Sequence, residues 1–226
     1  MAKELFPKVH IFCNNEDKRR FLNRGVFVNH LGVESLLVTN GSAMVFYPIE
    51  TLKVMVETDL TNQFITYDAL KMLGGMDVKD ITFAEEGIIY VDKLKRRQTI
   101  EWEGTILHDA ETEYERNGEI KKSKANKIYG RDFEEIGIFP NWKSVLPDEN
   151  VFKESSLNVC AWRGKFIADM LELRRPGCSI DDVILKCWLW RDLYITRWEV
   201  QKSSWGSDKI INPVVYLMPM ESIDAE

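Results

Sequence analysis

The sequence predicts an α+β fold made mostly of antiparallel sheet with few helices, divided into two domains. Many short segments rich in β-branched and aromatic residues alternate with turn signals, which is typical of antiparallel strands. Only two clear helices can be recognised from apolar residues at helical spacing. A length of 226 residues with 45% hydrophobic residues allows one large or two small domains with a real core.

The first strands surround a candidate hairpin turn. Gly25 to Asn29 and Ser35 to Val38 have the composition of short strands. We expect Asn40-Gly41 to supply both φ > 0 positions of a tight turn. Ala43 to Tyr47 then returns as the next strand, and Pro48 ends it.

A short helix follows these strands. Thr66 is suited to cap a helix from Tyr67 to Leu73, and Gly74-Gly75 is suited to end it. The segment from Asn15 to Leu22 has room for one more short helix. Three further strands are expected in this half: Ile81 to Phe83, Gly87 to Val91 and Gln98 to Trp102.

The stretch from His108 to Lys127 is the most polar part of the chain, with Asn117-Gly118 as a turn at its centre. We expect a charged hairpin or loop inserted into the domain at about residues 105–130. The segment from Phe139 to Asp148 contains two prolines and is the expected domain junction. The predicted domains are therefore residues 1–137 and 138–226.

The second half begins with a helix from Trp162 to Leu173, which Pro176-Gly177 ends. Two strands follow, Val183 to Trp190 and Leu193 to Val200, joined by a turn at Arg191-Asp192. The last strand, within Asn212 to Met220, ends in Met-Pro-Met. Taken alone it fits either a C-terminal core strand or one wall of an adaptable groove, because methionine suits both.

Motifs for catalysis or metal binding are absent from the sequence. His10 and Cys13 are three residues apart, but no second pair completes a zinc site. Asp181-Asp182 fits a solvated turn better than a general acid/base pair, since neighbouring side chains of a strand point to opposite faces. We therefore expect a protein that is not an enzyme and that has no cofactor and no metal.

Four scattered cysteines and the lack of a signal or membrane segment indicate a cytoplasmic protein with reduced thiols. The net charge of −6 gives no global sign of nucleic-acid binding. Three local basic clusters are either solvated loops or phosphate contacts. The candidate DNA contacts among them are Lys18, Arg19, Arg20, Lys95, Arg96 and Arg97.

Three segments resemble one family when they are read together. The run from Leu37 to Met44 (Leu-Val-Thr-Asn-Gly-Ser-Ala-Met) is similar to the strand–Thr-Asp-Gly–strand element of bacterial DNA sliding clamps, the β subunit of DNA polymerase III. The run from Phe139 to Pro147 is similar to that family's Phe-Pro-Asp-Tyr…Val-(Ile/Leu)-Pro junction. Tyr216 to Met220 is similar to its C-terminal Val-Val-Met-Pro-Met. The order and spacing hold from about Asn15 to Met220.

The resemblance implies two clamp-like domains and an apolar groove between them. In that family the groove docks short linear motifs from polymerases, the clamp loader and repair proteins. The groove residues that the resemblance implies here are Thr39, Gly41, Met44, Pro140, Val145, Tyr216, Leu217, Met218, Pro219 and Met220. It also implies a homo-oligomeric ring, dimeric or trimeric, around double-stranded DNA bound without sequence preference. No membrane partner is expected, because the sequence has neither a transmembrane segment nor a lipidation signal.

Two departures stand against a standard clamp. The Asn40-Gly41-Ser42-Ala43 run lacks the family's His-Arg, and Glu221 replaces the Arg after Met-Pro-Met, so the rim of the groove is less basic. The part after Pro147 is short for a clamp domain, and its helix carries Lys165, Asp169 and Glu172 away from the apolar stripe. Three hypotheses remain: a shortened, phage-type sliding clamp, a non-encircling adaptor or decoy that keeps the groove, and an enzyme on an unrelated α+β fold.

Overall fold

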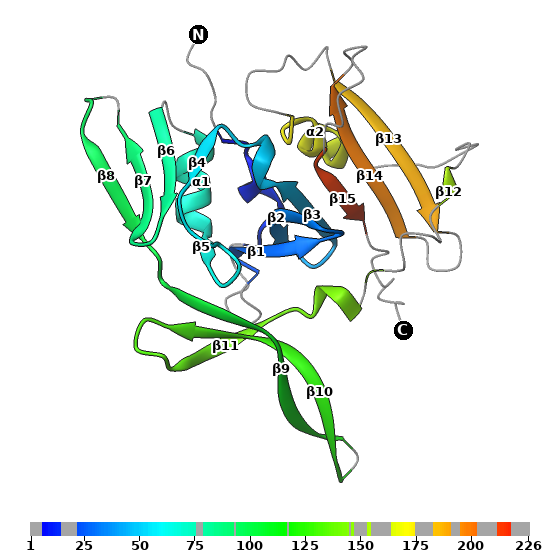
Figure 1. Ribbon diagram of the computed structural model, residues 1–226. Helices are drawn as coiled ribbons and strands as arrows, with labels where there is room; N and C mark the ends of the chain where they lie inside the picture. The colour runs from blue at the N-terminus through cyan, green and yellow to red at the C-terminus, as the bar shows by residue number, and fades with distance from the viewer. Residues whose placement is uncertain are drawn as a thin grey trace.

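One eight-stranded antiparallel sheet runs through both halves of the chain in the computed structural model (Figure 1). The structure describes residues 6–14, 22–75, 79–92, 94–116, 118–144, 146, 153–154, 164–174, 183–190, 195–202 and 212–217. The strands of the large sheet, in spatial order, are β12 (Lys153–Glu154), β13 (Val183–Trp190), β14 (Ile195–Lys202), β15 (Val214–Leu217), β3 (Ala43–Pro48), β2 (Val33–Thr39), β1 (Arg24–His30) and β5 (Phe64–Thr66).

Two smaller sheets and a few helices complete the fold. A four-stranded sheet has the order β4 (Val54–Val56), β6 (Lys79–Ala84), β7 (Gly87–Val91) and β8 (Arg97–Glu101), and β4 runs parallel to β6. A three-stranded sheet has the order β11 (Glu135–Phe139), β10 (Glu119–Gly130) and β9 (Gly104–Arg116). The helices are α1 (Tyr67–Gly75), α2 (Gly164–Leu171) and the 3-10 turns η1 (Val9–Phe12), η2 (Ile49–Thr51) and η3 (Trp142–Ser144). The described chain is thus a sheet-rich α+β fold with two α-helices.

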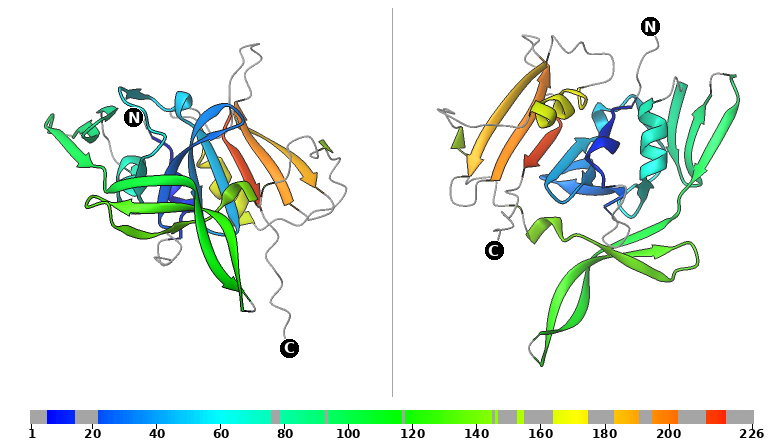
Figure 2. Two further views of the ribbon diagram at one scale, coloured as in Figure 1. Left: turned by 60° about the horizontal axis from the view of Figure 1, so that its bottom comes forward. Right: turned by 180° about the vertical axis from the view of Figure 1, so that it is seen from behind.

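One face of the large sheet packs against the helices. Leu70 and Leu73 of α1, Met170 of α2 and Phe12 of η1 are buried in the same apolar cluster as side chains from this face, including Val45 of β3. Figure 2 shows both helices lying over this side of the sheet when the molecule is seen from behind. The four-stranded sheet adds its own apolar side chains to the cluster, which makes this the larger of the two cores.

The other face is covered by the three-stranded sheet and η3. Ile106 of β9, Ile128 of β10 and Trp142 of η3 pack against side chains of the central strands, among them Phe46. Because both faces are covered, the central strand β3 is buried along its whole length instead of alternating between buried and exposed residues.

The local predictions agree well with the structure. The strands predicted at β1, β2, β3, β6 and β7 are all present, each within two or three residues of its predicted ends. β13 has the predicted ends, whereas β8 begins one residue earlier than predicted. Helix α1 begins after Thr66, whose hydroxyl accepts a hydrogen bond from the Ala69 amide at 3.4 Å. The predicted short helix at Asn15 to Leu22 lies outside the described residues except for Leu22, which is buried.

The hairpin turn between β2 and β3 differs from the prediction. Only Gly41 has a positive φ (90°), so Asn40 does not supply the second φ > 0 position. Instead the Asn40 side-chain oxygen accepts hydrogen bonds from the amides of Ser42 (3.0 Å) and Ala43 (2.9 Å). The asparagine therefore stabilises a wider loop through its side chain, as Asx turns do.

The polar stretch forms the long hairpin of β9 and β10, with Gly118 at the turn (φ 79°). Its outer part projects away from the two cores (Figure 1). The predicted junction at 137/138 falls inside β11, and the large sheet continues from β14 through β15 to β3 across that junction. The longer of the two described helices has nine residues, too few to cross a membrane.

Candidate functional site

The pairing of β15 with β3 joins two of the three segments that resemble a clamp. The strands are antiparallel, with Tyr216 opposite Met44 and Leu217 opposite Ala43. This contact links residues that are more than 160 positions apart in the chain, so no local pattern specifies it. We call this place the β3–β15 junction.

The third segment lies across one face of this junction. Trp142 packs edge-on against Phe46, with ring centroids 5.2 Å apart, and Tyr216 packs against the same ring at 5.7 Å. The Asn126 side chain donates a hydrogen bond to the Pro140 carbonyl at 3.1 Å, which holds the start of the segment against β10. Met44, Trp142 and Tyr216 share one apolar cluster.

The loop at the end of β2 is ordered by its own polar groups. The Thr39 hydroxyl donates to the Ala43 carbonyl at 2.7 Å and accepts from the Gly41 amide at 3.1 Å. With the two bonds to Asn40, these contacts fix the loop beside the junction. Gly41 is exposed there, and Pro140 is half-buried.

Several predicted groove residues are core residues in the structure. Thr39 is 2% exposed, Met44 3% and Tyr216 0%. Leu217 belongs to the cluster on the opposite face of the sheet from Met44 and Tyr216. The predicted groove residues Val145, Met218, Pro219 and Met220 lie outside the described residues.

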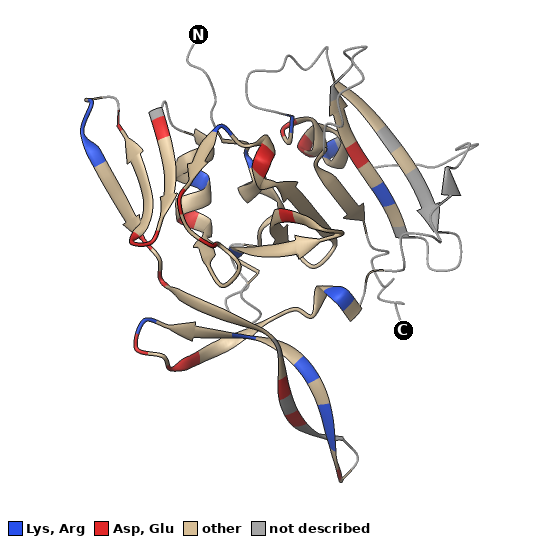
Figure 3. Cartoon of the chain, in the orientation of Figure 1, with Lys and Arg blue, Asp and Glu red and all other residues tan. Residues whose placement is uncertain are grey.

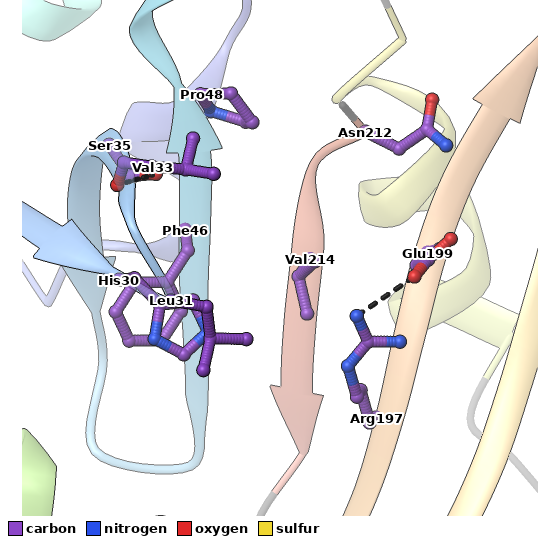
Figure 4. Close-up of a pocket in the computed structure, with 10 residues that line it drawn as sticks. All are labelled: His30, Leu31, Val33, Ser35, Phe46, Pro48, Arg197, Glu199, Asn212 and Val214. Atoms are coloured by element: carbon purple, nitrogen blue, oxygen red, sulfur yellow. Dashed lines mark hydrogen bonds and ion pairs between the residues drawn. The ribbon is translucent and has the colours of Figure 1, made fainter. Parts of the chain in front are cut away.

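A pocket of about 180 Å³ opens further along the same face of the sheet (Figure 4). Phe46 and Val214 from the two central strands line it, and each is two positions along its strand from a predicted groove residue. Arg197 and Glu199 of β14 form its polar wall as an ion pair of 2.8 Å. Sequence reasoning missed this pocket because its walls come from strands distant in the sequence.

His30 joins this pocket to the junction. Its ring stacks on Phe46 with centroids 3.9 Å apart and shares a hydrogen bond of 3.1 Å with the Tyr216 hydroxyl. Burial, with a smaller contribution from the nearby charge of Arg197, lowers the pKa of His30 to about 4. The imidazole is therefore neutral at pH 7 and behaves as part of the aromatic packing.

The two basic clusters that the structure describes do not meet in one place. Lys95, Arg96 and Arg97 lie at the end of the β7–β8 hairpin, and the lysines of β10 lie on the projecting hairpin at the opposite end of the molecule (Figure 3). Arg96 also pairs with Asp92 at 2.8 Å. The predicted contacts Lys18, Arg19 and Arg20 lie outside the described residues.

Within the described part of the chain, no three His, Cys, Asp or Glu side chains are grouped as metal ligands would be. Burial raises the pKa of the Cys13 thiol to about 12, so this sulfur stays protonated at neutral pH.

No family model, curated protein or solved structure matches this chain.

Proposed function

We propose that this chain is a sliding-clamp-like processivity factor, which docks short peptides of a polymerase or repair protein beside the β3–β15 junction and tethers them to DNA in the cytoplasm. The observation that carries the proposal is the meeting of the three clamp-like segments. Tyr216 is opposite Met44, and both share one apolar cluster with Trp142, which packs against Phe46. A chance resemblance of three short motifs has no reason to bring them together in space.

The buried residues of the junction suit a supporting role under this proposal. Met44 and Tyr216 are buried beneath the proposed docking surface, and the exposed Gly41 loop and half-buried Pro140 lie at its edge. We propose that a peptide docks along these edges and that the Met218-Pro219-Met220 run, which follows β15 in the sequence, supplies further contacts to it. Adaptable thioethers are suited to such a surface.

The test is binding of a fluorescein-labelled peptide that carries a clamp-binding motif with a Leu or Phe anchor. Replacing Met218 and Met220 by Asp should lower its affinity by about a hundredfold, because two apolar contacts are replaced by desolvated charges. Ile120→Asp, at a 74% exposed site on the projecting hairpin, is the matched control and should bind normally. A folded Met218→Asp/Met220→Asp variant that binds as well as wild type contradicts the proposal.

The helix surfaces favour a second candidate, an adaptor that does not encircle DNA. The outward sides of the helices carry both signs of charge: Asp68 and Lys71 on α1, and Lys165 and Asp169 on α2. Glu172, just after α2, pairs with Lys8 at 2.8 Å. A surface that lies along phosphates should carry mostly Lys and Arg.

A clamp and an adaptor differ in mass and in DNA topology. A clamp forms a dimeric or trimeric ring that stays on closed circular DNA and leaves once the circle is cut. An adaptor has the mass of a monomer or an open dimer and is not retained on the circle. Solution mass, measured beside retention on circular and linearised DNA, decides between the two.

A further inference from the structure

A second hollow adjoins the pocket of Figure 4. It measures about 320 Å³, lies on the other side of the β1–β2 turn, and is lined by Gly32, Val33, Glu34, Ile49, Glu50 and Val56. Val33 lines both cavities, so the two share a wall beside this turn. We call the pair the double hollow.

The turn between the cavities carries an exposed leucine in a costly conformation. Leu31 has a φ of 53° and is 63% exposed, and Gly32 follows with a φ of 81°. The left-handed conformation costs leucine about 1 kcal/mol, whereas Asn or Gly adopts it readily. Leu31 also lines the first pocket, where it stands beside His30 (Figure 4). An exposed, strained apolar side chain at the mouth of a cavity points to a contact surface.

The two cavities differ in charge. In the first, Arg197 and Glu199 neutralise each other, and Phe46, Pro48 and Val214 supply an apolar lining. Its volume of about 180 Å³ is below the ~300 Å³ at which sites for whole small molecules begin, and suits a single apolar side chain.

In the second hollow, the exposed carboxylates of Glu34 and Glu50 have no ion-pair partner among the described residues. This side of the double hollow is therefore acidic, whereas the other side is apolar and neutral.

We propose that the double hollow binds an extended peptide of a partner protein, with an aromatic or leucine side chain over Phe46 and Val214 and a Lys or Arg beside Glu34 and Glu50. The Asn212 carboxamide at the wall of the first cavity is available to the peptide backbone. This site shares no residue with the clamp-like groove, although Phe46 and Val214 belong to the same pair of strands, and it does not depend on the proposed function. The complementary charges select the partner, and the apolar cavity anchors it.

The probe is a set of fluorescein-labelled peptides with one Phe followed, after zero to four Gly, by Lys-Arg. A matched set carries Glu-Glu in place of Lys-Arg. Fluorescence polarisation should detect binding of at least one basic probe, with the matched acidic probe binding at least about tenfold more weakly. Absence of binding by every basic probe at about 1 mM protein, or equal binding of both sets, overturns the proposal.

Three variants locate the binding. Leu31→Asn should lower the affinity for the basic probe about fivefold. Because Asn suits the turn, the thermal stability of this variant should be at least that of wild type. Glu34→Lys/Glu50→Lys should lower the affinity for the basic probe about tenfold and raise the affinity for the acidic probe. Glu86→Lys, in the β6–β7 turn, is the matched control and should leave both unchanged.

Normal binding of the basic probe by Leu31→Asn and by Glu34→Lys/Glu50→Lys overturns the assignment to the double hollow. The clamp-motif peptide is titrated against the same proteins. Its affinity should not change in any of the three variants, so a failure of this site and a failure of the proposed groove give different results.

Discussion

At the residue scale, His30 shows how the two halves of the chain depend on each other. Its ring lies on Phe46 of β3 and bonds to the Tyr216 hydroxyl of β15. A protonated imidazole there would be a charge buried among aromatic rings with Arg197 nearby, and this is why the pKa falls to about 4. We therefore expect acid to destabilise the junction.

The first prediction concerns this sensitivity. Since the folded state holds a proton on His30 less readily than the unfolded state, the contribution of His30 to stability is complete above about pH 6.5. It should fall by about 3 kcal/mol in total as the pH drops from about 6.5 to about 4. Urea unfolding followed by near-UV circular dichroism measures this change. In His30→Gln, whose side chain cannot titrate, the free energy of unfolding should depend much less on pH over this range. An unchanged pH dependence would mean that other groups cause it.

The second prediction concerns Gly87 at the start of β7. It has a φ of 145°, and an added Cβ would meet the Ile100 carbonyl oxygen and would lie 2.8 Å from the Glu101 Cα. Gly87→Ala should therefore lower the free energy of unfolding by about 2 kcal/mol or more. Gly75→Ala at the end of α1, where nothing lies within 4 Å, should change it by less than about 0.5 kcal/mol. Equal effects of the two substitutions in chemical denaturation would refute the close approach of β8 to Gly87.

At the element scale, the β9–β10 hairpin has a structural base and a free arm. Ile106 and Ile128 at the base are buried against the large sheet. In the arm, Lys122 and Glu113 form an exposed ion pair of 3.7 Å, and such pairs stabilise a fold by about 1 kcal/mol at most. The arm therefore contributes little to the stability of the fold.

The third prediction follows from this division. Ala110 is opposite Ala125, so residues 111–124 can be replaced by Asn-Gly to close a shorter hairpin. The melting temperature should change by less than about 4 °C, the equivalent of less than about 1 kcal/mol in a domain of this size. Ile128→Ala at the base should instead cost about 3 kcal/mol. A much larger fall in the melting temperature of the shortened protein would show that the arm packs against another part of the chain.

Local elements can be predicted from the sequence because their causes are local. The Thr66 cap, the Gly118 turn and the strands rich in β-branched and aromatic residues all depend on neighbours in the chain. The pairing of β15 with β3 can be expected only through the clamp resemblance, because no nearby residue specifies it. The prediction for Asn40 is wrong because its side-chain hydrogen bonds replace a positive φ.

The candidate site shows the same division between local and distant causes. The three segments meet, yet Met44 and Tyr216 are buried in an apolar cluster with Ile106, Ile128 and Trp142, and this covering layer cannot be inferred from strand patterns. The pocket beside them brings His30 together with Arg197 and Glu199. These residues are far apart in the sequence and form no motif from which the pocket could be predicted.

At the scale of the whole molecule, one sheet joins the two halves. β3 lies in the interior of that sheet, with β2 on one side and β15 on the other. Without β15, the apolar strand β3 would become an open edge, and open apolar edges promote aggregation. The two halves should therefore depend on each other for stability.

The fourth prediction tests this dependence. A truncated chain of residues 1–146 should melt well below the full chain, or aggregate, because β3 loses its partner strand and Phe46 loses its ring contact with Tyr216. The full chain should unfold in a single thermal transition. Two separate transitions, together with a soluble fragment as stable as the full chain, would indicate independent domains.

The proposed function requires three distant segments to form one docking surface for a partner peptide. Hydrogen exchange followed by mass spectrometry, with and without the clamp-motif peptide, tests it most directly. The peptide should slow exchange together in residues 39–47, 139–146 and 212–220, and leave the arm at residues 111–124 unchanged. Binding that protects only one of the three segments, or protects a surface elsewhere, would rule out a docking surface shared by the three.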